Sequence, residues 1–249
     1  MYVSYPSNPA VLASAYGQLL GLLVEAPEID AVLEKMVGLA AEVVTPAVAC
    51  GLTVRRDGQP FTAAMTNELA ARVDEIQYGS DEGPCLDALR QGLVVQVDDL
   101  TQESRWDSYR PHAVAHGVRS SLSLPLTVEG EILAALNLYS VMPAVFGGPH
   151  RESAEAFADK SAAALTVSLR QVRHARVQHQ LAEAMVSSSV IDQAIGILMA
   201  QQRCTASAAF DMLRAASQHR NRKLREIAAE MVTTVSGAPP QPRPGFRMD

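Results

Sequence analysis

Residues 187–235 read SSSVIDQAIGILMAQQRCTASAAFDMLRAASQHRNRKLREIAAEMVTTV, and this stretch decides how the fold of the chain is interpreted. Apolar residues recur in it every three or four positions, over 191–198, over 209–213 and over 224–235. This spacing is typical of amphipathic helices, so the stretch predicts three short helices whose apolar stripes pack into a small bundle. Because such a bundle buries little apolar surface by itself, a long preceding helix and dimerisation are expected to stabilise it.

The same end of the chain is basic, although the protein as a whole has a formal net charge of −6. Residues 170–249 carry 11 Lys and Arg against 6 Asp and Glu, whereas residues 1–169 carry 10 against 21. The sequence HRNRKLR at 219–225 falls where the second predicted helix meets the third. Its guanidinium groups could neutralise phosphates and stack on unpaired bases. On charge alone, however, the sequence favours an ordinary solvated surface balanced by Glu226 and Glu230.

Length and composition limit the number of folded units and the class of protein. A chain of 249 residues with 48% hydrophobic content can bury one substantial core and still leave a second small unit. The first residues lack a basic segment, and acidic residues from Glu25 onward interrupt the apolar run, so neither secretion nor membrane insertion is expected. The cysteines Cys50, Cys85 and Cys204 are widely spaced, which fits reduced thiols in the cytoplasm.

The region before residue 141 alternates between helical and strand patterns. Helices are expected over 11–24, 29–44, 68–77, 85–91 and 105–116, the last interrupted by Pro111. Strands are expected over 48–55, 61–66, 94–97, 120–128 and 131–140, with hairpin turns at Asp57-Gly58 and Glu129-Gly130. Antiparallel strands with helices covering one side predict a compact α+β domain.

A long helix is expected next, because no Pro or Gly occurs between Pro149 and Gly196. Over 154–169 it could fold back onto the first domain or leave it, whereas over 170–181 a solvated connector between two chains is favoured. Gly196 costs up to about 1 kcal/mol relative to Ala. It therefore predicts a close approach, by a neighbouring helix more than by a ligand. The tail at 237–249 is rich in Pro and Gly and is expected to be disordered.

Three motifs in order carry a family resemblance. IDQAIGILM at 191–199, CTASAAFDMLR at 204–214 and RKLREIAAEMV at 222–232 resemble the ANTAR domain, the AmiR and NasR transcription antitermination regulator family. Members are three-helix RNA-binding modules that recognise paired stem-loops as dimers and prevent a terminator hairpin from forming. The resemblance implies RNA binding by a homodimer. The candidate RNA-binding residues are Gln193, Arg214, Arg220, Arg222, Lys223 and Arg225.

Some positions depart from the family pattern. Ile195 stands where many members have Lys, and Ser188 stands where Arg is common, so two potential phosphate contacts are missing. Arg203 replaces a frequent Gly, and a left-handed conformation there would cost on the order of 1 kcal/mol. Thr205 or Ser207 is predicted to cap the second helix. Weaker RNA affinity, or tighter control by the sensor, is therefore expected.

The first part of the chain resembles a GAF domain. The resemblance rests on DEGPCLDA at 81–88, RW at 105–106, HGVRSSLSLPL at 116–126 and ALNLY at 135–139. It is similar to the type that precedes ANTAR modules in actinobacterial regulators, and it implies a six-stranded antiparallel sheet with helices. GAF domains sense small molecules, chromophores or redox state, and fold does not settle which. The motif with which some members bind cyclic nucleotides is not matched here.

A ligand pocket is expected beneath the loop at 79–85 and the helix at 105–116, over the sheet. The candidate ligand-sensing residues are Cys85, Asp87, Trp106 and His112. Helix dipoles could activate Cys85 as a redox sensor, but its acidic neighbours disfavour a thiolate, and a buried, inert cysteine is favoured. His112 and His116 share a helical face, where surface histidines are favoured over a metal site. No catalytic residues, metal site or cofactor is predicted.

The predicted organisation is an N-terminal helix at 1–28, a GAF-like sensor at 29–169, a helical connector at 170–186, an ANTAR bundle at 187–236 and the tail at 237–249. A small-molecule or redox signal would change the connector of a cytoplasmic dimer and so the presentation of its arginines to RNA. Two alternatives stay open. One is a GAF-fold methionine sulfoxide reductase using Cys85 with Cys50, and the other is a DNA-binding or protein-interaction bundle.

Overall fold

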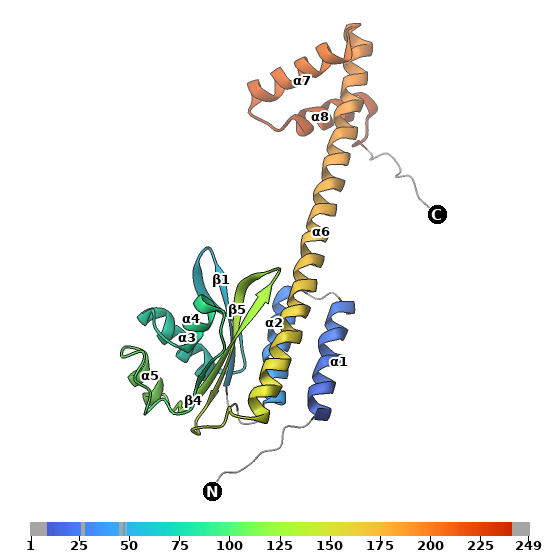
Figure 1. Cartoon of the computed structure of the whole chain (residues 1–249). Helices are drawn as coiled ribbons and strands as arrows, with labels where there is room; N and C mark the ends of the chain where they lie inside the picture. The colour runs from blue at the N-terminus through green and yellow to red at the C-terminus, as the bar shows by residue number, and fades with distance from the viewer. Residues whose placement is uncertain (1–8, 26–27, 45–46, 48, 241–249) are drawn as a thin grey trace. The chain divides into compact units, whose positions relative to one another are not determined.

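The structure is a computed structural model that describes residues 9–25, 28–44, 47 and 49–240. The chain divides into two compact units, Met1–Val172 and Arg173–Asp249. Helix α6, Pro149–Gln202, begins in the first unit and ends in the second (Figure 1). Of the predicted disordered tail, residues 241–249 lie outside the described residues. None of the described helices has the length and apolar character that a membrane span needs.

The first unit is built on an antiparallel sheet. Its strands are β1 Ala49–Arg56, β2 Gln59–Met65, β3 Val95–Val97, β4 Ser120–Val128 and β5 Glu131–Ser140. They lie in the order β2-β1-β5-β4-β3, and each neighbouring pair is antiparallel. The described residues thus form five strands, where the family resemblance implied six. After β3 the backbone makes single hydrogen bonds, such as Leu100 N to Arg119 O at 2.7 Å, in place of a further ladder.

The two predicted hairpin turns are confirmed. Asp57 and Gly58 have φ of 52° and 81°, and Glu129 and Gly130 have φ of 53° and 87°. Two left-handed residues in succession make the turn whose twist matches that of paired strands, so each turn closes its hairpin without splaying the strands. Arg56 pairs with Gln59 at the first turn.

Helices occupy the expected positions with one exception. They are α1 Pro9–Glu25, α2 Ile29–Val43, α3 Glu68–Ser80, α4 Pro84–Gln91 and α5 Arg110–Ala115. The helix predicted over 105–116 is wrong in its first half, because α5 begins only at Arg110 and Trp106 has a left-handed φ of 57°. Pro111 therefore lies in the first turn of α5, where its missing N–H interrupts no helical hydrogen bond.

The sheet has one apolar face. Helices α1 and α2 and the first part of α6 lie on this side, whereas α3, α4 and α5 lie on the other (Figure 1). Leucines of the strands, such as Leu122 and Leu136, pack there with Ala154, Phe157 and Leu165 of α6. Burial of these side chains is the main source of stability for the unit. Over 154–169 the long helix therefore folds onto its own domain, which decides the question that the sequence left open.

The second unit is a three-helix bundle formed by the end of α6, α7 Ala206–Arg220 and α8 Leu224–Ser236. Its core is Val190, Ala194, Leu198, Ala209, Leu213, Ile227, Ala228 and Val232. The predicted stripe of α6 is displaced by about one position, because Ile191 and Ile195 are only partly buried while Val190 and Ala194 are buried. The bundle itself is as predicted.

The ends of the bundle helices follow local chemistry. The Thr205 hydroxyl accepts a hydrogen bond from Ala208 N at 3.3 Å and caps α7, as predicted. Arg203 has a φ of 49°, so the condition under which replacing Gly would be costly is met. The close approach predicted at Gly196 is wrong, because Gly196 is exposed and an added Cβ would meet nothing within 4 Å.

Candidate functional site

The cationic side chains of the second unit gather where α7 meets α8. We call Arg214, Arg220, Arg222, Lys223 and Arg225 the basic junction, and all five are exposed. The side chains of Arg214, Arg220 and Arg222 are 62%, 55% and 44% exposed. Gln193, the sixth candidate, is partly buried on α6 beside the buried Ala194. A polyanion can therefore reach every guanidinium of the junction.

Three of these arginines carry a carboxylate partner. Arg222 pairs with Glu230 at 2.6 Å and with Glu226 at 3.5 Å, and Arg220 also reaches Glu230 at 3.3 Å. The pairing lowers the pKa of Glu230 and raises the pKa of Arg222. Exposed pairs of this kind contribute little to stability because solvent screens them. They position the guanidiniums without sealing them, so a phosphate can take the place of the carboxylate.

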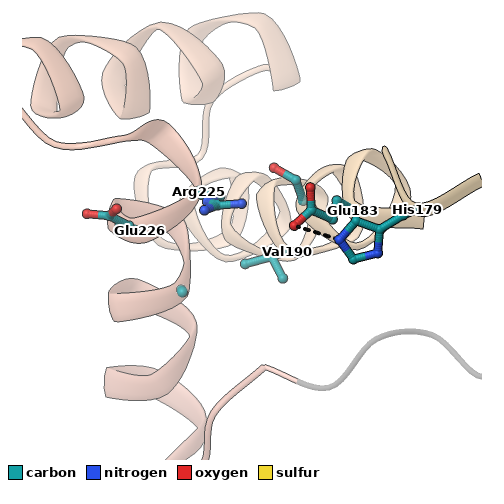
Figure 2. A pocket seen from close by; sticks show the side chains of 7 residues that line it. His179, Glu183, Val190, Arg225 and Glu226 are labelled. Carbon is teal, nitrogen blue, oxygen red and sulfur yellow. Dashed lines mark ion pairs between the residues drawn. The ribbon is translucent and has the colours of Figure 1, made fainter. Parts of the chain in front are cut away.

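Arg225 behaves differently from Arg222. Helix α8 begins at Leu224, so Arg225 lies in its first turn whereas Arg222 lies just before the helix. Arg225 instead extends toward α6 (Figure 2). The side chains of Arg225 and Lys223 make no hydrogen bond or ion pair to any residue that the structure describes. Both cationic side chains are therefore available to bind an anion or a base without first breaking an ion pair to a described residue.

Arg225 lines a groove between α6 and α8, which we call the α6–α8 groove (Figure 2). The groove has a volume of about 470 Å³ and is lined by His179, Glu183, Ser187, Val190, Arg225, Glu226 and Ala229. His179 Nε2 lies 3.7 Å from Glu183 Oε1. Sequence reasoning missed the α6 members because they fall in or next to the predicted connector. Their spacing of four, four and three places them on one helical face, a signal that was available.

A second candidate site is buried in the first unit. On the sheet face toward α3 and α4, polar side chains alternate with the leucines of the opposite face, and we call this set the polar layer. Its members are Thr53, Asp74, Gln77, Tyr109, Ser121, Ser123, Asn137 and Tyr139, all fully buried. Sequence reasoning missed this layer, since polar residues alternating along a strand normally mark a solvated face.

Asp74 is the centre of the polar layer. Its carboxylate accepts hydrogen bonds from Tyr139 Oη, from Asn137 Nδ2 at 3.2 Å and from Thr62 Oγ1 at 3.1 Å. Burial raises the pKa of Asp74 to about 7, although these hydrogen bonds lower it in part. The residue ties α3 to two strands and is poised to change charge near neutral pH.

Four buried polar atoms of the layer have no hydrogen-bond partner among the described residues. They are Tyr109 Oη, Ser121 Oγ, Ser123 Oγ and Asn137 Oδ1. Buried polar atoms are nearly always paired, so such a group calls for a polar occupant, water or ligand. The layer lies under α3, α4 and α5, which is where the sequence predicts a ligand pocket.

The predicted ligand-sensing residues separate into three environments. Asp87 accepts a hydrogen bond from Trp106 Nε1 at 2.9 Å, and the Trp106 ring packs edge-on against Tyr109. Cys85 is fully buried and donates to Thr53 Oγ1 at 3.2 Å. The predicted burial of Cys85 is found, and this burial raises the pKa of its thiol well above its usual value, which disfavours a thiolate. His112 is exposed on α5, away from the buried layer.

Comparison with known proteins assigns both parts of the chain. The family model of the GAF domain matches residues 26–166, and that of the ANTAR domain matches residues 179–232. None of the curated proteins matches the chain.

Solved structures resemble the first part. The GAF domain of a phosphoenolpyruvate-protein phosphotransferase from Coxiella burnetii is 21% identical with a TM-score of 0.53, covering 69% of this chain and 99% of that one. A free methionine-R-sulfoxide reductase from Neisseria meningitidis, in complex with its substrate, is 16% identical with a TM-score of 0.53, covering 70% and 98%. At these identities the likeness shows a shared fold alone.

Proposed function

The chain belongs to the GAF domain family, with an ANTAR domain after the GAF domain, and we propose that it binds tandem RNA hairpins as a homodimer and prevents transcription termination in response to a signal. An ANTAR domain implies an RNA-binding antitermination regulator, and a GAF domain implies a sensor. The observation that supports RNA binding is the exposed basic junction on an otherwise acidic chain. We place this activity in the cytoplasm, where transcripts are made.

The basic junction suits a folded RNA. Arg220 and Arg222 form exposed ion pairs with Glu230 that a phosphate can replace. The side chains of Lys223 and Arg225 have no partner among the described residues. Guanidinium groups bind phosphate through two parallel hydrogen bonds. Each phosphate that the junction neutralises releases counterions, so affinity should fall steeply as salt rises.

The homodimer is supported by an apolar stripe along α6 within the second unit. The α6 stripe consists of Val177, Leu181, Ala184, Ser188, Ile191 and Ile195, spaced alternately four and three residues apart as in a coiled coil. The side chains of Val177 and Leu181 are 57% and 61% exposed in the single chain. A second copy of α6 would bury these side chains. Pairing two bundles in this way would also match the two hairpins of a tandem site.

The signal would reach the bundle through α6. One end of this helix supplies Phe157 and Leu165 to the apolar core of the first unit. The other end supplies Ala194 and Leu198 to the core of the bundle. A change in the polar layer that moved the sheet against α6 would therefore act on a helix shared by both cores.

Reversing charge at the basic junction tests RNA binding. In the full chain, Arg222→Glu combined with Arg225→Glu should weaken binding to hairpin pairs, selected from a random library, by at least about 100-fold and lower the salt dependence by about two counterions. Arg176→Glu, an exposed site on α6, is the control and should bind like the wild type. Unchanged affinity in the double variant would refute the proposal. Equal displacement of the RNA by duplex DNA would support the DNA-binding alternative instead.

The reductase alternative is not favoured. Cys85 and Cys50 are both fully buried, and burial raises the pKa of Cys50 to about 12. A sulfoxide reductase of this kind needs a thiolate that reaches its substrate. The architecture, a GAF domain joined to an ANTAR domain, also fits a regulator better than an enzyme.

A further inference from the structure

We infer that the α6–α8 groove is a binding site for one unpaired guanine base of the bound RNA, recognised between Arg225 of α8 and Glu183 of α6. The inference rests on the proposed RNA binding. Attraction between the basic junction and phosphates would not require this groove, and the inference gives the groove a role. It makes Arg225 a base-specific contact, and it leaves the phosphates to the rest of the basic junction.

The charge of the groove argues for a base and against a phosphate. Two carboxylates, Glu183 and Glu226, stand in its lining with the guanidinium of Arg225 and the imidazole of His179, whose Nε2 lies 3.7 Å from Glu183 Oε1. The two carboxylates would repel a phosphate, whereas a neutral base can accept from Arg225 and donate to Glu183. Val190 and Ala229 add apolar surface on which the face of a base can lie. The volume of about 470 Å³ falls within the usual range for small-molecule sites.

The hydrogen-bonding groups select guanine. Arg225 and Glu183 approach the groove from different helices (Figure 2). The Arg225 side chain makes no hydrogen bond or ion pair to a described residue. A guanidinium donates to the O6 and N7 acceptors of guanine. A carboxylate, which only accepts, suits two neighbouring donors, and among the four bases guanine alone presents them, as N1–H and N2–H₂. An unpaired guanine thus fits between the two charges, with its Hoogsteen edge toward Arg225 and its Watson–Crick edge toward Glu183.

The position of the groove is consistent with this role. Arg222 and Lys223 come just before Arg225 in the chain, so the phosphate next to an inserted base can be held by the basic junction. Around the axis of α6, Val190 of the groove lies about 180° from Leu181 of the α6 stripe and about 100° from Ile191. A dimer formed through the α6 stripe would therefore use a different face of α6 from the groove.

The test asks whether the Glu183 carboxylate contacts the N2 amine of a loop guanine. Hairpin RNAs with randomised loops are selected for binding to the full chain, and each loop guanine of the winners is then replaced by inosine, which lacks only the N2 amine. At one position, inosine should weaken binding to the wild type about 10-fold, within the range for a base-specific contact. Glu183→Ala should bind the guanine and inosine RNAs equally. Asp192→Ala removes an equal charge from an exposed site on the opposite face of α6 and should keep the wild-type ratio.

The outcomes separate this inference from the proposed function. If Glu183→Ala keeps the full inosine penalty, or if the selected loops show no preference for guanine, the guanine site is refuted. Binding would still be lost on charge reversal at Arg222 and Arg225, and the proposed function would stand. If the full chain selects no RNA, the proposed function fails as well. If Glu183→Ala turns a dimer into a monomer in sedimentation, the groove is an interface between copies and the inference is overturned.

Discussion

Asp74 shows how one buried side chain can make stability depend on pH. Its folded-state pKa of about 7 lies above its usual value of 3.8. The unfolded chain releases this proton first, so the stability that the neutral form contributes is complete below about pH 4 and is lost as pH rises toward 7. The free energy of unfolding of the first unit should therefore fall by about 3 kcal/mol between pH 5 and pH 8.

Asp74→Asn keeps the side chain neutral at every pH, so this slope should disappear, as denaturant titrations at pH 5 and pH 8 would measure. Glu34→Gln, at an exposed site of α2, is the matched control and should keep the slope. Equal slopes in the wild type and Asp74→Asn would show that Asp74 does not titrate in this range. Nothing in the sequence marks Asp74, because it stands in a helix among charged neighbours, and only the fold places it under the sheet.

Between α6 and α7, one residue, Arg203, has an unfavourable backbone conformation. Arg203 occupies a left-handed position with φ of 49°, where a Cβ costs on the order of 1 kcal/mol. Arg203→Gly should therefore raise the free energy of unfolding of the second unit by about 1 kcal/mol in thermal or denaturant unfolding. Arg203→Ala removes the same charge but keeps the Cβ, so it should give no gain. A gain of the same size from Arg203→Ala would assign the effect to charge instead.

Elements were predictable where their causes are local. The hairpin turns and the Thr205 cap depend on a few adjacent residues, and each is found as expected. The first half of the helix predicted at 105–116 is not found. Trp106 has a left-handed backbone conformation there, and its indole N–H donates a hydrogen bond to Asp87. That contact joins residues 19 positions apart, beyond the reach of local periodicity.

At the scale of the whole molecule, the order of motifs and the division of charge predicted two units and their classes. What they did not predict is how surfaces far apart in sequence meet. The polar layer needs α3 over β5, and the α6–α8 groove needs Glu183 beside Arg225. Each arises from tertiary packing, so the residues that give the sensor and the RNA surface their specificity were the hardest to find from sequence.

The α6 stripe gives the whole molecule its predicted dimer, and Leu181 is its most exposed large member. In Leu181→Glu, pairing would bury two carboxylates against each other, so the dissociation constant of the dimer should rise at least about 100-fold, as sedimentation equilibrium would measure. Arg176→Glu, one residue before the stripe begins, is the control and should stay dimeric.

Affinity for RNA gives a second measure of the same change. Two linked bundles gain avidity on a tandem site, so Leu181→Glu should bind tandem hairpins no more tightly than a single hairpin, while its affinity for the single hairpin stays at the wild-type level. Loss of single-hairpin binding as well would mean that the substitution disturbs the bundle itself. A wild-type chain that sediments as a monomer with undiminished affinity for tandem RNA would show that α6 needs no second copy.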